Sequence, residues 1–180
     1  MATPPTLLAG PTRVWDRFVR CFHWSLVGCV VLNQGLLEAG DTAHQWVGYA
    51  ASALVLARVL WGFVGSPHAR FVDFFPTPQR LGTYLRALRQ GQHPAYAGHN
   101  PLGALMVLAL LALVLALGLT GWLQTTDAFW GEAWLQDLHE WLADGLWIAA
   151  GLHGAAALVV GRLERVRLVR AMFTGTKTPY

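Results

Sequence analysis

The sequence contains few of the residues on which small secreted or soluble domains depend. It has only two cysteines, Cys21 and Cys29, so a scaffold held together by several disulfides is excluded. Charged residues make up 13% of the 180 residues, about half of the roughly 25% that is usual for a soluble protein. Residues 1–14 contain no apolar stretch of the kind found in signal peptides, so we expect no cleavable leader. An ordinary soluble enzyme is therefore disfavoured.

The composition also narrows the possible partners. No stripe of Lys and Arg alternates with aromatic residues, so the net charge of +3 does not indicate binding to nucleic acid. Hydrophobic residues make up 54% of the chain, which excludes a disordered protein. These residues are grouped in long blocks, so the expected partner is the lipid bilayer.

The hydrophobic residues form four long stretches. Each is close to the roughly 20 residues that cross a bilayer as a helix. We therefore predict membrane-spanning helices over residues 18–38, 43–64, 101–124 and 138–161. The predicted fold is an all-α membrane protein, a bundle of four transmembrane helices, with residues 1–180 forming a single domain.

A shorter segment, residues 76–90, follows the second predicted helix. Leu81, Tyr84, Leu85 and Leu88 recur there at helical spacing with arginines between them. This pattern predicts an amphipathic helix. It would lie either on the inner membrane surface or in the cytoplasm as a linker.

The basic residues are confined to three parts of the chain. Apart from Arg58, every Lys and Arg lies before Cys21, between residues 65 and 100, or after Gly161. The connections between helices one and two, and three and four, carry only acidic charges: Glu38, Asp41, Asp127, Glu132 and Asp137. The positive-inside rule therefore places both termini and the long middle segment in the cytoplasm. We expect the acidic connections to face the periplasm, with the helices in the inner membrane of a bacterium.

Four of the seven histidines fall within or at the ends of the predicted membrane helices, where ionisable side chains are costly and so are functional candidates. His139 and His153 are 14 residues apart, about 40° short of four helical turns and about 21 Å along the axis, so they face the same way. Because the first helix runs outward and the second inward, His23 lies near the inner side and His44 near the outer side. The depths predict two pairs, one inner and one outer. The remaining histidines are expected at the surface or as helix caps: His68, His93 and His99.

Two neutral imidazoles from facing helices can bind one metal on its two axial sides. The redox centre that uses this ligand set inside an apolar helix bundle is b-type haem, so the two pairs predict two haems b. Zinc would require four ligands at one point, whereas the pairs are about 20 Å apart. No Cys-x-x-Cys-His motif is present, so covalent attachment in the manner of c-type cytochromes is excluded.

Other residues of these helices allow two interpretations each. Arg58, 14 residues after His44, would bind an anion such as a haem propionate or a quinone oxygen, or would extend to the inner headgroups. Gly48, one turn after His44, would let a porphyrin approach the backbone or would serve ordinary helix packing. Asn33 and Gln34 are expected to form hydrogen bonds between helices rather than to bind quinone.

Several stretches of the chain resemble a known family. In chain order they are VWDRFVRCFHW, AHQWVGYAASALVLARVLWGFVG, HARFVDF, GHNPLGALMVL and LHEW followed by GLHGAAAL. Over residues 13–175 the sequence is similar to the bacterial cytochrome b561 and nickel-hydrogenase-type cytochrome b family. The spacing of the last two histidines and the R-x-x-W-G-F motif are the specific signals. The resemblance implies a four-helix cytochrome that passes electrons between membrane quinone and a partner, with His23 and His153 binding the inner haem and His44 and His139 the outer one.

Three functions remain open. The first expectation is a quinone-linked electron-transfer oxidoreductase whose partner is a periplasmic redox protein such as a c-type cytochrome, because the acidic outer connections suit a basic protein. A superoxide:quinone oxidoreductase ranks second, because those carboxylates would repel an anionic substrate. The third is a membrane-anchor cytochrome b subunit of a hydrogenase or dehydrogenase. Hydrogenase-type members often have an additional helix, so four helices favour the first function over the third.

Overall fold

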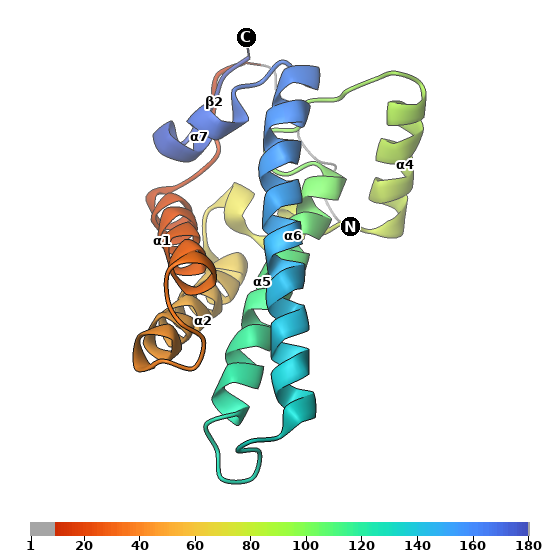
Figure 1. The fold of residues 1–180 in the computed structure, drawn as a ribbon. Helices are drawn as coiled ribbons and strands as arrows, with labels where there is room; N and C mark the ends of the chain where they lie inside the picture. The colour runs from red at the N-terminus through yellow and green to blue at the C-terminus, as the bar shows by residue number, and fades with distance from the viewer. Residues whose placement is uncertain (1–9, 180) are drawn as a thin grey trace. The chain divides into compact units, whose positions relative to one another are not determined.

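The computed structural model describes residues 10–179, and within them the chain is mostly helical (Figure 1). Four helices are long: α1 (Arg17–Gly35), α2 (Thr42–Val64), α5 (Pro101–Leu123) and α6 (Ala133–Leu163). The shorter elements are the strands β1 (Thr12–Arg13) and β2 (Thr176–Lys177), the 3-10 helix η1 (Pro67–Ala69), and the helices α3 (Phe71–Phe74), α4 (Pro78–Arg89) and α7 (Leu168–Thr174).

The long helices confirm the predicted element types and shift some boundaries. α6 begins at Ala133 rather than at residue 138, because residues 133–137 contain no Gly or Pro that would interrupt a helix. It ends at Leu163, shortly before Arg165 takes a positive φ of 54°. α1 ends at Gly35 rather than at residue 38, and Gly40, with φ 85°, supplies the turn into α2. The amphipathic segment forms α4, in which Thr77 accepts a hydrogen bond from the Arg80 amide as the N-cap.

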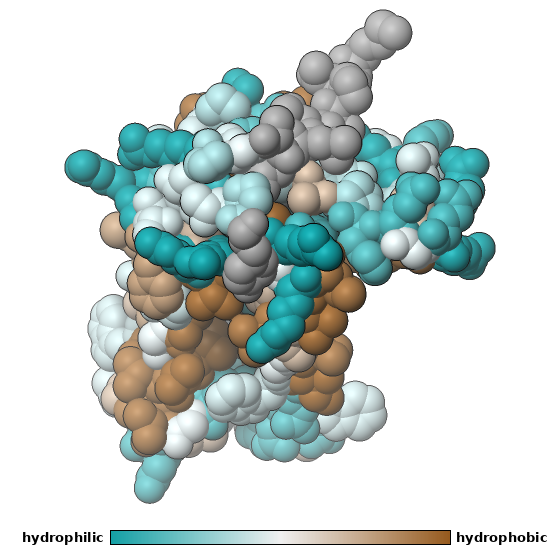
Figure 2. All heavy atoms as spheres, turned by 90° about the horizontal axis from the view of Figure 1, so that it is seen from above, coloured by the Kyte–Doolittle hydropathy of each residue, from teal (hydrophilic) through white to brown (hydrophobic). Residues whose placement is uncertain are grey.

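Among residues 10–179, three helices are long and apolar enough to cross a membrane: α2, α5 and α6. Many of their large side chains remain exposed, including Leu60 and Phe63 of α2, and Figure 2 shows broad areas of exposed hydrophobic side chains. Such surfaces are expected of helices that contact lipid. α1 is not among the three, since it carries Arg17, Arg20 and polar residues near its end. The span predicted for α1 stays a prediction.

The described chain divides into two compact units. The terminal unit contains the residues before Cys21, Val59–Val107 and the residues from Leu152 onward. The histidine unit contains Cys21–Arg58 and Leu108–Gly151, and therefore holds His44 and His139.

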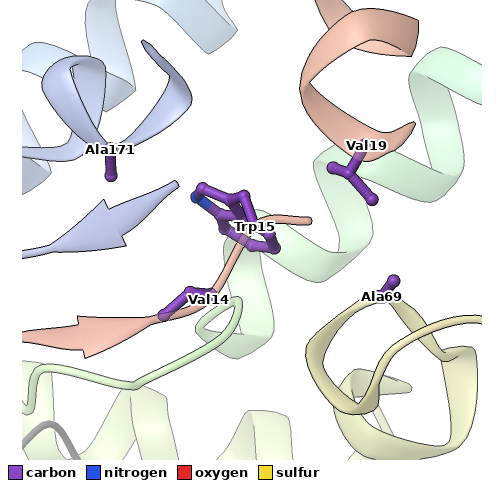
Figure 3. Packing of buried hydrophobic residues seen from close by; sticks show 5 residues of the cluster. All are labelled: Val14, Trp15, Val19, Ala69 and Ala171. Carbon is purple, nitrogen blue, oxygen red and sulfur yellow. The ribbon is translucent and has the colours of Figure 1, made fainter. Parts of the chain in front are cut away.

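The core of the terminal unit is built around Trp15. β1 pairs with β2 in antiparallel register, with Thr12 opposite Lys177, and this pairing brings the two ends of the chain together. The Trp15 side chain lies among those of the four other core residues, which are Val14, Val19, Ala69 and Ala171 (Figure 3). The four come from the segment after β1, from α1, from η1 and from α7, so one aromatic ring joins elements that are far apart in sequence.

Asp16, next to Trp15, is the polar centre of the same region. Its Oδ1 accepts a 2.8 Å hydrogen bond from the Val19 amide, which caps the start of α1. Its Oδ2 accepts from the Trp61 indole nitrogen at 2.9 Å and from the Ser66 hydroxyl at 2.6 Å. Trp61 belongs to the R-x-x-W-G-F motif, so the tryptophan of that motif fixes the end of α2 to the start of α1.

The packing of α2 also explains why the same motif has a glycine, Gly62, after its tryptophan. A Cβ on Gly62 would lie 2.2 Å from the Phe71 ring, which is closer than any real contact. Glycine therefore allows α2 and the aromatic side chain of α3 to approach each other.

Candidate haem-binding site

α1 is fixed to its neighbours within the histidine unit by two amide side chains. Asn33 Nδ2 donates to the His44 carbonyl of α2 at 3.1 Å. Gln34 Nε2 donates to the Ala143 carbonyl of α6 at 2.8 Å. The prediction that both residues form hydrogen bonds between helices is confirmed.

α5 contacts its two neighbours through a glycine and a hydroxyl. A Cβ on Gly118 would lie 2.1 Å from Ser52 Oγ of α2, so only glycine fits there. Thr120 Oγ1 lies 2.8 Å from His139 Nδ1 of α6. Together with the α1 contacts, these interactions join the four helix segments of this unit in a closed ring.

This arrangement of the four helix segments brings together the two histidines of the predicted outer pair. The imidazole centroids of His44 and His139 are 6.4 Å apart, with 64° between the ring planes. Two imidazoles bound to opposite sides of one metal at about 2 Å have ring centres about 6 Å apart. His44 Nδ1 is buried and has no hydrogen-bond partner among the residues that the structure describes. The spacing between the two rings fits two histidines that bind one haem iron.

A metal ion without a porphyrin is a poorer fit. Within residues 10–179, no three or more His, Cys, Asp or Glu side chains come together as a ligand group. Two histidines alone leave a zinc or iron ion without a complete coordination shell. A porphyrin supplies four nitrogens and completes the set.

The chain resembles known b-type cytochromes. The profile of the prokaryotic cytochrome b561 family matches residues 14–175. The chain belongs to the prokaryotic cytochrome b561 family. It is therefore a membrane b-type cytochrome, and its cofactor is haem b.

Curated relatives of this cytochrome carry the name "Probable Ni/Fe-hydrogenase B-type cytochrome subunit". The protein from Bradyrhizobium diazoefficiens is 25% identical, with 91% of this chain and 85% of the relative covered. The protein from Rhodobacter capsulatus is 26% identical over 92% of this chain and 80% of its own length. For Azotobacter vinelandii the identity is 26%, over 74% of this chain and 66% of the relative. No solved structure matches the chain.

Two residues of α5 lie beside His139 in this cytochrome. Thr120, which contacts His139, was not predicted from the sequence. It is the one hydroxyl residue in the otherwise apolar α5. A polar side chain in a membrane helix is by itself an indication of a functional role. A Cβ on Gly121 would lie 3.2 Å from His139 Cε1, so the glycine lets the imidazole pack directly against the α5 backbone.

Gly48 and Arg58, both in α2, were predicted to contact a haem or a quinone. A Cβ on Gly48 would lie 3.4 Å from Asn33 Nδ2, and the Gly48 carbonyl accepts a hydrogen bond from Ser52 Oγ at 2.9 Å. These are contacts of ordinary helix packing, and a porphyrin contact at Gly48 stays a prediction. Arg58 is 3% exposed, which disfavours a side chain extended to the headgroups. Its proposed anion stays a prediction.

The inner pair of the cytochrome is not tested by the structure. His23 belongs to the histidine unit, where its ring makes an edge contact with Trp24 at 4.9 Å between centroids. His153 belongs to the terminal unit. The assignment of His23 and His153 to one haem stays a prediction that rests on their places in the sequence.

One loop histidine differs from its expected position. The ring of His99 lies 4.7 Å from the Trp15 ring and 4.7 Å from the Phe74 ring, and its Nδ1 is buried. His99 is therefore a half-buried packing residue and not a helix cap. The residue that caps α5 is Asn100, whose Oδ1 accepts from the Gly103 amide at 2.7 Å.

The terminal unit contains a second group of buried polar side chains, centred on Lys177. Lys177 is 5% exposed, and its Nζ donates to the carbonyls of Tyr96 at 3.0 Å and Gly98 at 2.5 Å. Burial lowers the pKa of Lys177 to about 8, while the nearby carboxylate of Glu164 acts in the opposite direction. Burial raises the pKa of Glu164, which accepts a hydrogen bond from Asn100 Nδ2 at 2.9 Å.

We expect the stability of the protein to rise between pH 8 and pH 10 because of Lys177. Its pKa falls from 10.5 to about 8 on folding, so across this interval the unfolded chain binds more protons than the folded one. The cost of burying the charged amine is complete below pH 8 and is relieved as the pH rises, by about 2 kcal/mol up to pH 10. Thermal unfolding in detergent, followed by circular dichroism at several pH values, measures this rise.

Lys177→Met is the control for that experiment, because it keeps the length of the side chain and removes the titrating group. The variant is expected to lose the rise between pH 8 and pH 10. The interval ends at pH 10 because burial raises the pKa of Tyr84 to about 12, so ionisation of tyrosine in the unfolded chain lowers stability above that pH. An equal rise in the variant and the unaltered protein would contradict the assignment to Lys177.

Proposed function

We propose that this cytochrome is the membrane electron-transfer subunit of a redox enzyme, with two haems b, and that it passes electrons between the partner enzyme and membrane quinone. The single observation that carries the proposal is the approach of His44 to His139, with 6.4 Å between ring centroids. This spacing supports a haem site at the predicted depth. The inner site, His23 with His153, is proposed from the sequence spacing alone.

The proposed topology is that of residues 1–180 acting as one di-haem domain in the bacterial inner membrane. α1 would be the fourth membrane span, and both termini would lie in the cytoplasm. The distribution of basic residues along the chain supports this orientation, because the two proposed outer connections contain no Lys or Arg.

The residues of the chain have distinct roles in this proposal. Haem b supplies one-electron oxidation and reduction when bound. His44 and His139 would bind the outer haem, while the apolar helices would exclude water around it. Arg58 would compensate the charge of a propionate or a quinone oxygen, and Gly48 would allow the porphyrin to lie near α2.

The partner that we propose is a dehydrogenase or hydrogenase that docks on the outer side. The names of the relatives, Ni/Fe-hydrogenase cytochrome subunits, support this choice over the c-type cytochrome that the sequence alone favoured. A periplasmic c-type cytochrome is the second candidate. It is favoured by the acidic outer connections, with Glu38, Asp41, Asp127, Glu132 and Asp137, which would attract a basic protein.

Purification of the full chain from membranes in a mild detergent tests the proposal. We expect a b-type difference spectrum, two haems per chain, reduction by a quinol analogue, and a redox enzyme that copurifies with the chain. In right-side-out vesicles, a protein electron acceptor that cannot enter should oxidise the haems from the outside.

The outcomes separate the candidates. One haem per chain would refute the di-haem proposal. Fast oxidation of the isolated chain by a basic c-type cytochrome, with no copurifying enzyme, would favour the second candidate. Oxidation of the haems only by acceptor added to the outside of inverted vesicles, which is the cytoplasmic side, would reverse the proposed orientation.

A further inference from the structure

We infer that the hydroxyl of Thr120 is a positioning group for His139, which fixes the protonation and orientation of this ligand and thereby sets the reduction potential of the outer haem. The inference rests on the proposed haem site at His44 and His139. It adds a residue from α5, a helix that contributes no iron ligand.

The geometry determines which atom donates to which. Thr120 Oγ1 lies 2.8 Å from His139 Nδ1, 2.9 Å from the Ala116 carbonyl and 3.2 Å from the Leu117 carbonyl. The carbonyls can only accept, and the hydroxyl has one proton to give. With Nε2 of His139 bound to iron, Nδ1 carries the ring proton and donates it to Thr120. The Thr120 hydroxyl then donates its own hydrogen bond to the Ala116 carbonyl.

The surroundings of Thr120 keep this hydrogen bond in place. Thr120 is 6% exposed, so water does not compete with the imidazole for its oxygen. A Cβ on Gly121 would lie only 3.2 Å from His139 Cε1, so the absence of a side chain there lets the imidazole lie close to the α5 backbone beside Thr120. A ligand histidine whose second nitrogen donates a hydrogen bond is held in one orientation and is a stronger base toward the metal.

The other proposed ligand, His44, differs from His139 in its hydrogen bonding. His44 Nδ1 has no hydrogen-bond partner within residues 10–179. The two imidazoles of the site are therefore inequivalent, and the stronger donor would be His139. Because a more basic ligand stabilises oxidised iron more than reduced iron, loss of the Thr120 bond should raise the potential of the outer haem.

The experiment compares Thr120→Val with Thr120→Ser in the purified full-length cytochrome. Valine has the shape of threonine without the hydroxyl, and serine keeps the hydroxyl. In redox titrations, Thr120→Val is expected to lower the oxidised-to-reduced ratio of one haem by about three- to tenfold at fixed ambient potential, where tenfold corresponds to about 59 mV. The electron paramagnetic resonance signal of the same oxidised haem should shift, and Thr120→Ser should restore both values.

Thr126→Val is the matched control. The Thr126 hydroxyl donates to the Leu123 carbonyl at 2.6 Å, so this variant loses a comparable local hydrogen bond just beyond the end of α5, away from the imidazole. It should leave both haems unchanged. The second haem in Thr120→Val serves as an internal reference and should also be unchanged.

The remaining outcomes are distinct. Unchanged potential and resonance signals in Thr120→Val, with both haems bound, would overturn the inference. Loss of the outer haem in Thr120→Val with retention in Thr120→Ser would support it, whereas loss in both would show a packing role and overturn it. Failure of the proposed function is separate, because it would show as a haem missing from the unaltered protein.

Discussion

Replacement of His139 by alanine is expected to remove one of the two haems and to leave the other in place. The structure brings the rings of His139 and His44 to 6.4 Å between centroids, and a haem iron held by one imidazole is bound far more weakly than one held by two. A pyridine haemochrome assay on the purified variant, normalised to protein, should give half of the haem of the unaltered chain.

Three further variants test the pairing itself. His44→Ala should remove the same haem, so the double variant of His44 and His139 should lose no more than either single variant. His23→Ala should remove the other haem. His93→Ala, in the exposed segment before α5, is the control and should retain both. Additive loss in the double variant, or two haems retained in His139→Ala, would refute the outer pair.

Replacement of Asp16 by alanine is expected to destabilise the protein by about 3 kcal/mol. The variant loses the cap on the Val19 amide, worth about 1 kcal/mol. It also leaves the Trp61 indole and the Ser66 hydroxyl without their carboxylate, and each partly buried donor left without a partner costs about 1 kcal/mol or more. The midpoint of chemical unfolding in detergent, followed by circular dichroism, measures the loss.

Asp73→Ala is the matched control for Asp16. Asp73 pairs with Arg70 at 3.2 Å, but both side chains are substantially exposed, and such pairs contribute less than about 1 kcal/mol. The control should therefore shift the midpoint much less than Asp16→Ala does. Equal shifts in the two variants would show that the three hydrogen bonds of Asp16 do not stabilise the fold.

Local patterns in the sequence were sufficient to predict the main elements. The apolar stretches predicted α2, α5 and α6, and the alternation of leucines and arginines predicted α4. The depth argument predicted that His44 and His139 lie close together, and the structure places their ring centroids 6.4 Å apart. The helix predictions succeeded because helix length and periodicity depend on neighbouring residues.

The contacts of single polar side chains were beyond local patterns. Thr120 reads as an isolated hydroxyl in an apolar helix, and the sequence does not reveal that His139, on the next long helix, packs against it. Lys177 counts in the sequence as one more basic residue of a cytoplasmic tail, yet it is 5% exposed and bound to the carbonyls of Tyr96 and Gly98. The spacing of residues within one helix does not predict such contacts between distant segments of the chain.

The sequence by itself determined a helical membrane b-type cytochrome and the histidines available to bind haem. Only the tertiary structure decided that Thr120 supports one of those histidines, that Asp16 fixes the tryptophan of the R-x-x-W-G-F motif, and that Lys177 is buried. The physical reason is the range of the interactions. Hydropathy and helical periodicity act between near neighbours in the chain, whereas a hydrogen bond between distant segments depends on how the whole chain packs.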